Sequence, residues 1–431
     1  MKPANNMKLS GSLVALAMVS SSSALAQNSW TGGSSYYYTC DIYTCSVAGN
    51  NLWSTSSNWS NGIPTASQDV NIGLSTYQSG SSGRPVQHDT VQNTGSAAAG
   101  NLFIGFSGGR AASGSFGAGY LTNSGTLAVS NTMVVGSTGV GNFSNSGTTT
   151  VGGNLAVGTI VSGALSNAAT GTITVNGRVS LGTHASGTGR LLNNGRITSG
   201  DHFVIGESGY GELYTVGLPA TTTVGGDIAI GATATGVGIS ITSQGTMNGS
   251  GRLDVGVRGA GHLIVQGGGR VNNEIGVIAK EPGAWGYALV NGAGSLWHSR
   301  QSLTLGSESG TEGVLVINEG GTVRVANGLG TLTIGEKAGS TGILNIGAFS
   351  PLGIDYGLHA TAKDWLSNAD TTSAAVAPGT LDANFVLFGE GSGTVNFKHT
   401  GSLAQDYRFK AGFGCRLGCG GLLRGWRSLR V

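Results

Sequence analysis

The 431-residue sequence has few charged residues, few prolines and few cysteines. Charged residues make up 10% of it and the formal net charge is only +2, which gives no support for nucleic-acid binding. The 7 prolines argue against a disordered Pro/Gly tract, and the 79 glycines lack the strict every-third spacing of collagen. No apolar run is long enough to cross a bilayer as a helix. These absences leave an ordered protein built from short elements.

The sequence is rich instead in short Val, Ile and Leu runs separated by Gly, Ser, Thr and Asn, a pattern typical of strands and tight turns. One phrase, a three-residue strand-like run that ends on glycine, recurs along the middle of the chain. Its glycines are Gly105, Gly136, Gly158, Gly182, Gly206, Gly231, Gly256, Gly306 and Gly335. Between Gly136 and Gly256 the steps are 22, 24, 24, 25 and 25 residues.

A repeat of this length with three short strands is one coil of a parallel β-solenoid. We therefore predict an all-β chain that folds as a right-handed parallel β-helix of about ten coils with a capping N-terminal segment. At the strand spacing of ~4.8 Å the rod would be roughly 50 Å long. Asn123, Asn145 and Asn167 recur every 22 residues, so their amides are expected to stack into a hydrogen-bonded ladder.

The N-terminus has the three parts of a secretory signal peptide. Lys2 and Lys8 supply positive charge, an apolar core follows over Gly11–Val19, and an A-x-A site ends at Ala26. We predict cleavage between Ala26 and Gln27, and therefore export of the mature chain.

The rest of the chain divides by composition. We expect a cap segment with a cysteine pair at 27–100, solenoid repeats at 101–350, and terminal coils with an insertion at 351–410. The tail 411–431 contains four arginines and no acidic residue. That composition is typical of out-of-frame translation, which indicates a frameshift or truncation near Lys410.

The cap segment carries two groups of candidate residues. Cys40 and Cys45 are a candidate disulfide in an oxidising compartment, with free thiols as the alternative. A single C-x4-C pair is a poor zinc site. Trp53 and Trp59 with Val70 fit a cap over the first coil, which would otherwise expose unpaired strand edges. The alternative for these aromatic rings is a platform that binds sugar.

One coil carries an unusual set of aromatic and basic residues. Trp285, Tyr287, Trp297, His298 and Arg300 form a candidate binding patch for carbohydrate or protein. The alternative is structural, with Trp297 stacked against the next coil.

Acidic residues are scattered through the coils without a repeated register. Among them are Asp201, Glu207, Glu212, Asp227, Asp254 and Glu274. Glycosidases need two carboxylates within several ångströms of each other, and Asp at the turn before a strand is ordinarily a bend former. The seven histidines lack metal-ligand spacing, and no calcium-binding repeat is present. We expect no catalytic, cofactor-binding or metal-binding residues.

Three stretches resemble a known family. "NLWSTSSNWSNGIPTASQDVNIG", "ALVNGAGSLWHSRQSLTLGSESGTEGVLVINEGGTVRV" and "AVAPGTLDANFVLFGEGSGTVNFKHTGS" are similar to the passenger region of bacterial type V autotransporters of the AIDA-like class. The resemblance covers most of the chain from Leu52 to Lys410. It implies a signal peptide, a β-helical passenger and a C-terminal outer-membrane β-barrel. It also implies surface display, often with adhesion to host cells, matrix or other bacteria.

The sequence departs from that pattern at its end, where no stretch resembles the alternating strands of a barrel. The expected function is that of an exported, non-enzymatic adhesin, surface-displayed if joined to a barrel and otherwise periplasmic or secreted. Its partner would be a protein or carbohydrate of a host-cell, matrix or bacterial surface, and not nucleic acid. The alternatives are a polysaccharide-active enzyme on a β-helix and a truncated product without function.

Overall fold

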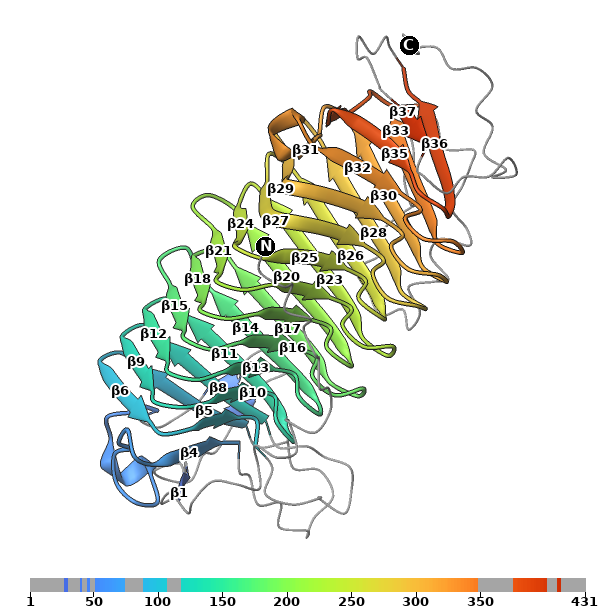
Figure 1. Cartoon of the computed structure of the whole chain (residues 1–431). Coiled ribbons are helices and arrows are strands. Elements are labelled where there is room, and N and C mark those ends of the chain that lie inside the picture. The colour runs from blue at the N-terminus through green and yellow to red at the C-terminus, as the bar shows by residue number, and fades with distance from the viewer. Residues whose placement is uncertain are drawn as a thin grey trace.

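The chain folds as an elongated parallel β-solenoid, as predicted (Figure 1). The computed structural model describes residues 27–29, 39–40, 45–46, 51–73, 88–106, 118–347, 375–400 and 409–411. The predicted signal peptide and nearly all of the basic tail lie outside these ranges. Within them the helices are two single 3-10 turns, η1 (Ser56–Asn58) and η2 (Ala326–Gly328).

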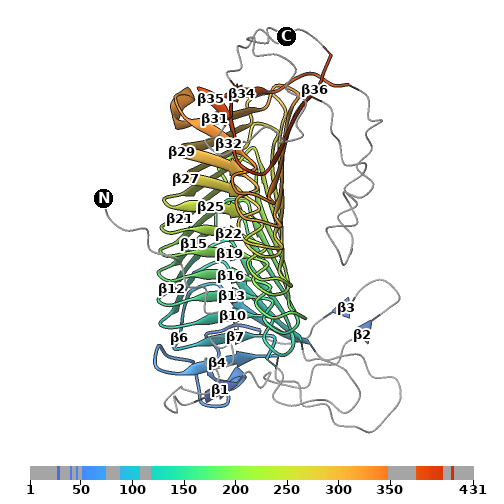
Figure 2. The same cartoon turned by 45° about the vertical axis from the view of Figure 1, so that its right-hand side comes forward.

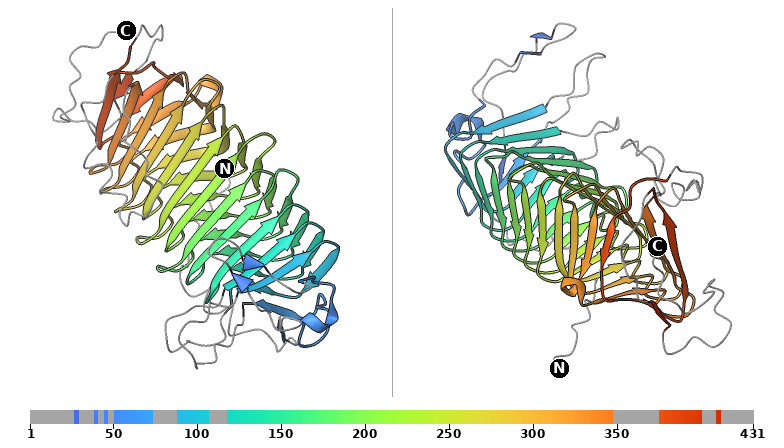
Figure 3. Two further views of the ribbon diagram at one scale, coloured as in Figure 1. Left: turned by 180° about the vertical axis from the view of Figure 1, so that it is seen from behind. Right: turned by 90° about the horizontal axis from the view of Figure 1, so that it is seen from above.

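One side of the rod is a 12-stranded parallel sheet to which each coil contributes one strand (Figure 3). Its strands are β5 (His88–Asn93), β8 (Ala118–Asn123), β11 (Val140–Asn145), β14 (Ser162–Asn167), β17 (Thr188–Asn193), β20 (Tyr210–Val216), β23 (Val237–Ser243), β26 (Ala260–Gln266), β28 (Trp285–Asn291), β30 (Glu312–Asn318), β33 (Thr341–Gly347) and β36 (Ser392–Lys398). Ten of them follow one another from β8 to β33, so the chain completes nine turns there. That agrees with the predicted coil number.

The remaining sides are formed by a 23-stranded sheet of shorter strands. They are β1 (Gln27–Ser29), β4 (Asp69–Ile72), β6 (Ser96–Ala99), β7 (Leu102–Ile104), β9 (Thr126–Val129), β10 (Met133–Val135), β12 (Thr148–Val151), β13 (Leu155–Val157), β15 (Thr172–Val175), β16 (Val179–Leu181), β18 (Arg196–Ser199), β19 (Phe203–Ile205), β21 (Thr221–Val224), β22 (Ile228–Ile230), β24 (Thr246–Gly249), β25 (Arg252–Val255), β27 (Arg270–Ile278), β29 (Leu296–Leu305), β31 (Thr322–Val325), β32 (Thr331–Ile334), β34 (Thr380–Asp382), β35 (Phe385–Phe388) and β37 (Phe409–Ala411).

The repeated glycines serve two structural purposes. All nine glycines of the repeated phrase have positive φ, between 61° and 78°, at the corner that leads into the 12-stranded sheet. A second set lies near the start of each strand of that sheet from β8 onward, where coils approach closely. A Cβ added to Gly163, for example, would lie 2.0 Å from the carbonyl oxygen of Val135. Glycine content is therefore a consequence of tight coil stacking.

The N-terminal aromatic residues belong to the core. Trp53 and Trp59 are buried with their ring centroids 4.8 Å apart, and Val70 is fully buried in the same hydrophobic core. The indole N–H of Trp59 donates to the carbonyl oxygen of Trp53 at 2.8 Å. These rings pack over the first coils, and as buried groups they offer no face to a sugar.

The cysteine pair lies on a separate hairpin of β2 (Thr39–Cys40) and β3 (Cys45–Ser46). The strands are antiparallel, and the backbone register sets Cys40 opposite Cys45. The side chains of these residues lie outside the described part of the structure, so the disulfide stays a prediction.

Candidate interaction site

The five residues of the predicted binding patch lie on two different sheets. Trp285 and Tyr287 are on β28 of the 12-stranded sheet, whereas Trp297, His298 and Arg300 are on β29 of the 23-stranded sheet (Figure 1). The chain turns a corner of the solenoid between these strands. The structure therefore does not bring the five side chains together on one surface.

Trp297 is an interior residue. Its side chain is fully buried, and its indole N–H donates to Oδ1 of Asn273 in the preceding coil at 2.7 Å. This hydrogen bond satisfies the one polar group of the indole. Trp297 thus joins neighbouring coils and cannot contact a partner.

Arg300 lies at the surface in an ion pair with the preceding coil. Its Nη1 is 2.8 Å from Oε1 of Glu274, and Gln301 Nε2 donates to the other oxygen of that carboxylate at 3.0 Å. The hydrogen bond from Arg300 is the main cause that lowers the pKa of Glu274. Burial, followed by the nearby Arg300 and Arg324 charges, lowers the pKa of His298.

Trp285 and Tyr287 form an aromatic group with His262, which the sequence analysis did not single out. The Trp285 and Tyr287 rings are nearly parallel at 6.3 Å, and the His262 ring is 4.8 Å from that of Trp285. Burial lowers the pKa of His262 to about 4 and raises that of Tyr287. The repeat length is the signal that could have found His262, because it lies one coil before Tyr287 in register.

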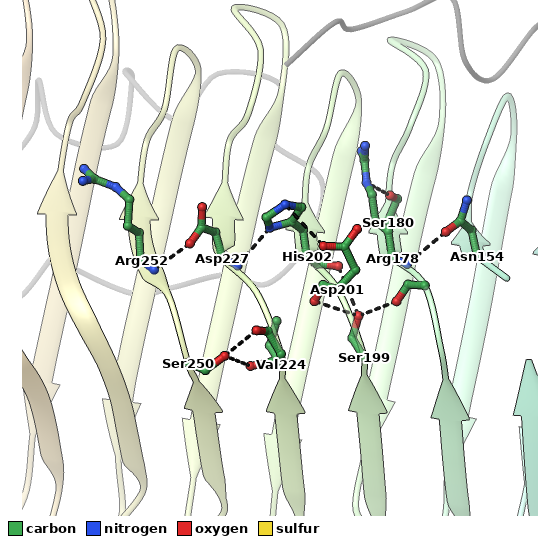
Figure 4. A network of polar contacts seen from close by, with 12 residues as sticks. Asn154, Arg178, Ser180, Ser199, Asp201, His202, Val224, Asp227, Ser250 and Arg252 are labelled. Carbon is green, nitrogen blue, oxygen red and sulfur yellow. Dashed lines mark hydrogen bonds and ion pairs between the residues drawn. The ribbon is translucent and has the colours of Figure 1, made fainter. Parts of the chain in front are cut away.

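The corner residues near Asp201 and Asp227 form a polar network along the stack (Figure 4). Asp227 Oδ1 accepts from the backbone N–H of Arg252 at 2.8 Å, and the N–H of Asp227 donates to Nδ1 of His202 at 2.9 Å. His202 Nε2 also lies 3.3 Å from Oδ1 of Asp201. These contacts match the bend-forming interpretation of Asp227, since its side chain accepts from the backbone of the next coil.

Two other acidic residues are buried and paired. Asp254 lies 2.6 Å from Lys280 Nζ and 3.4 Å from Arg252 Nε. Burial raises the pKa of Asp254, and the Lys280 and Arg252 charges oppose that shift.

Glu212 is the second buried acid. Its Oε2 lies 2.9 Å from Arg190 Nε, and Oε1 accepts from the Tyr210 hydroxyl. Burial and this hydrogen bond raise the pKa of Tyr210. A carboxylate without solvent exposure is placed to hold coils together and not to reach a polymeric substrate.

An open polar surface is present on the four-residue strands of the 23-stranded sheet. In β12, β15, β18 and β21, alternate residues face outward in register. They are Thr148, Thr150, Thr172, Thr174, Arg196, Thr198, Thr221 and Thr223. We call this surface the threonine face. All eight are exposed or half-buried, whereas the residue between each pair is buried.

The described residues contain no group of three or more His, Cys, Asp and Glu side chains placed to hold a metal ion. No helix in the described ranges is long and apolar enough to span a membrane. Comparisons of the chain with protein-family models, curated proteins and solved structures gave no match.

Proposed function

We propose that the chain is the exported, β-helical passenger of an autotransporter and acts as a non-enzymatic adhesin in surface attachment. The solenoid is compatible with this function, and the resemblance of three stretches to AIDA-like passengers supports it. A protein or carbohydrate on a host-cell, matrix or bacterial surface would be the partner.

The observation that carries the proposal is the threonine face. Thr150, Thr174, Thr198 and Thr223 stand in one column, one per coil, at the strand spacing of ~4.8 Å. Each hydroxyl can donate and accept one hydrogen bond to a sugar or peptide group. Single contacts of this kind are weak, but a rigid array presents them simultaneously, so that avidity determines the strength of attachment.

Bead attachment tests this proposal. Beads coated with the purified chain are applied to epithelial cells, extracellular matrix and bacteria, and retained beads are counted under flow. The test variant carries Thr150→Gln, Thr174→Gln and Thr198→Gln. The matched control carries Thr122→Gln, Ser144→Gln and Ser166→Gln, which stand in one column on the outer side of the 12-stranded sheet.

We expect the unaltered chain and the control to attach to at least one surface, and the test variant to lose most of its attachment. Equal retention of beads by the two triple variants would show that the threonine face does not mediate attachment. Absence of attachment to all three surfaces would contradict adhesion itself. Release of new chain ends from a panel of acidic polysaccharides would favour an enzyme instead.

A further inference from the structure

The two outward columns that contain the threonine face run along most of the rod. They begin on β6 and continue in register through β9, β12, β15, β18, β21, β24, β27, β29 and β31, along one side of the rod in Figure 2. Each of these ten strands contributes two outward residues, and the residue between them is buried. All twenty outward residues are exposed or half-buried. We call them the polar side of the rod.

The polar side presents only positive charge. Its permanently charged residues are Arg196, Arg270 and Arg324, and none of its twenty positions holds Asp or Glu. The whole chain, by contrast, has 22 basic and 20 acidic residues. Two acids flank the polar side, Glu274 on β27 and Asp382 on β34, and each is already paired with an arginine at 2.8 Å and 2.6 Å. An acidic partner therefore meets no opposing charge on these positions.

Arg196 and Arg270 are the arginines available to such a partner. Both are exposed, and among the described residues neither forms an ion pair. They stand in one column three coils apart, with Thr221 and Thr246 between them. Three strand spacings of ~4.8 Å separate their backbones by roughly 14 Å. The partner that contacts both is therefore an elongated molecule with more than one acidic group.

The chemistry of this column matches an acidic sugar chain. Each guanidinium can donate two parallel hydrogen bonds to an acidic group such as a carboxylate. The threonine hydroxyls between the arginines can both donate and accept, as the hydroxyls of a sugar do. The column thus offers cations for the acidic groups and hydroxyls for the rest of the chain.

A peptide or a nucleic acid fits the polar side less well. A peptide that adds to a sheet needs a strand with an unpaired edge, and β18, β21 and β24 each pair with a neighbouring strand on both sides. Single-stranded nucleic acid stacks its bases on aromatic rings, and none of the twenty positions holds Phe, Tyr or Trp. These two classes lack the contacts on which they depend.

We propose that the polar side binds a linear acidic polysaccharide, with Arg196 and Arg270 on its carboxylate or sulfate groups and the threonines between them on its hydroxyls. The inference rests on the proposed adhesin function, for which it names the class of ligand. Because both arginines are exposed, salt screens their charge, and binding weakens as the ionic strength rises.

Binding of labelled polymers to the immobilised full chain tests the proposal. The probes are heparin, dextran sulfate and polygalacturonate, with neutral dextran as the uncharged polymer and polyglutamate as the acidic peptide. The test variant carries Arg196→Gln and Arg270→Gln. The matched control carries Arg258→Gln and Lys337→Gln, which removes the same charge from exposed, ion-paired residues at the corner that leads into the 12-stranded sheet.

We expect the unaltered chain and the control to bind at least one charged polysaccharide. The test variant should bind it at least about tenfold more weakly at an unchanged melting temperature, because two charge-assisted contacts are lost. Preference for dextran sulfate would assign the contacts to sulfate, and preference for polygalacturonate would assign them to carboxylate. Equal affinity of the two variants, equal binding of neutral dextran, or tighter binding of polyglutamate would overturn the proposal.

The outcome is separable from that of the bead attachment test. Bead retention on a surface without binding of any charged polysaccharide would overturn the polysaccharide inference and leave adhesion in place. Binding of a charged polysaccharide that depends on Arg196 and Arg270, without attachment to cells, matrix or bacteria, would support the site and contradict the adhesin function.

Discussion

The first and last coils of the rod fill equivalent interior positions with opposite chemistry. Near the end of each strand in the 12-stranded sheet, the early coils bury asparagine and the late coils bury aliphatic residues. In register the column contains Asn93, Asn123, Asn145, Asn167, Asn193, Thr215, Thr242, Val265, Val290, Ile317 and Ile346. One solenoid thus has two kinds of interior at the same place.

The asparagine half of the column can be buried because its side-chain amides form hydrogen bonds with one another. Each Nδ2 from Asn93 to Asn167 donates to Oδ1 of the next asparagine at 2.7–2.9 Å. The ladder ends on hydroxyls, where Asn193 Nδ2 donates to Thr222 Oγ1 at 3.1 Å. Buried polar groups are tolerated when they are satisfied in this way. Whether an interior position accepts a polar residue therefore depends on the residues above and below it in the same column, and not on that position alone.

Introducing an asparagine into the apolar half of the column should have the largest effect on the free energy of unfolding. Val290→Asn would bury an amide between Val265 and Ile317, neither of which can hydrogen-bond to it. We expect the free energy of unfolding to fall by about 4 kcal/mol. Urea denaturation followed by circular dichroism measures this change. A loss below about 1 kcal/mol would show that the two halves are interchangeable.

Removing an asparagine from the ladder should lower the free energy of unfolding slightly less than Val290→Asn does. Asn145→Val deprives Asn123 Nδ2 of an acceptor and Asn167 Oδ1 of a donor, with an expected loss of about 3 kcal/mol. Asn142→Val, on the outer side of the same strand, is the control and should change little. The pair Asn123→Val with Asn145→Val should cost less than the sum of the single variants, because both lose one shared bond. Full additivity would contradict the ladder.

Acidification should destabilise the late coils through His262. Burial lowers its pKa from 6.5 to about 4 in the folded chain, so between these values the unfolded chain binds more protons. Stability is therefore full above pH 6.5 and falls as the pH decreases toward 4. From pH 7.5 to 5 we expect His262 to account for a loss of about 2 kcal/mol. Urea denaturation at both pH values measures this loss of unfolding free energy, and His262→Phe should remove the part due to His262. If the variant lost as much stability between pH 7.5 and 5 as the unaltered chain, His262 would not be the cause.

The smallest effect concerns the corner of a late coil. Ala279 occupies the position that glycine takes in the other coils, with φ of 60°. Ala279→Gly relieves this strain and should raise the free energy of unfolding by about 0.5–1 kcal/mol. Gly306→Ala should do the reverse by a larger amount, because its Cβ would lie 2.2 Å from the Thr341 carbonyl oxygen. Thermal melting of both variants checks the opposite signs.

The fold was predictable because every coil needs a short buried strand followed by a corner glycine, so coil stacking produces a repeated sequence motif. The ladder was predicted for Asn123, Asn145 and Asn167 and is confirmed for them. Its ends at Asn93 and Asn193 were missed, since coils of other lengths interrupt the 22-residue step. The coil that contains Ala279 was missed for a related reason, because alanine replaces the corner glycine by which the other coils were recognised.

The candidate site was less predictable than the fold. Trp285 and Trp297 are close in sequence, but a solenoid corner between them separates their side chains. Residues one repeat apart are the true neighbours on such a surface, as His262 and Tyr287 show. The threonine face was missed for the same reason, since Thr150 and Thr174 become neighbours only when coils are aligned.

Attachment by the folded rod is the central claim, and bead retention under flow tests it most directly. The unaltered chain is compared with the Thr150→Gln, Thr174→Gln, Thr198→Gln variant and with its matched control on the 12-stranded sheet. The account predicts retention by the unaltered chain and the control, and loss in the threonine-face variant at an unchanged melting temperature. No retention of the unaltered chain on cells, matrix or bacteria would contradict it.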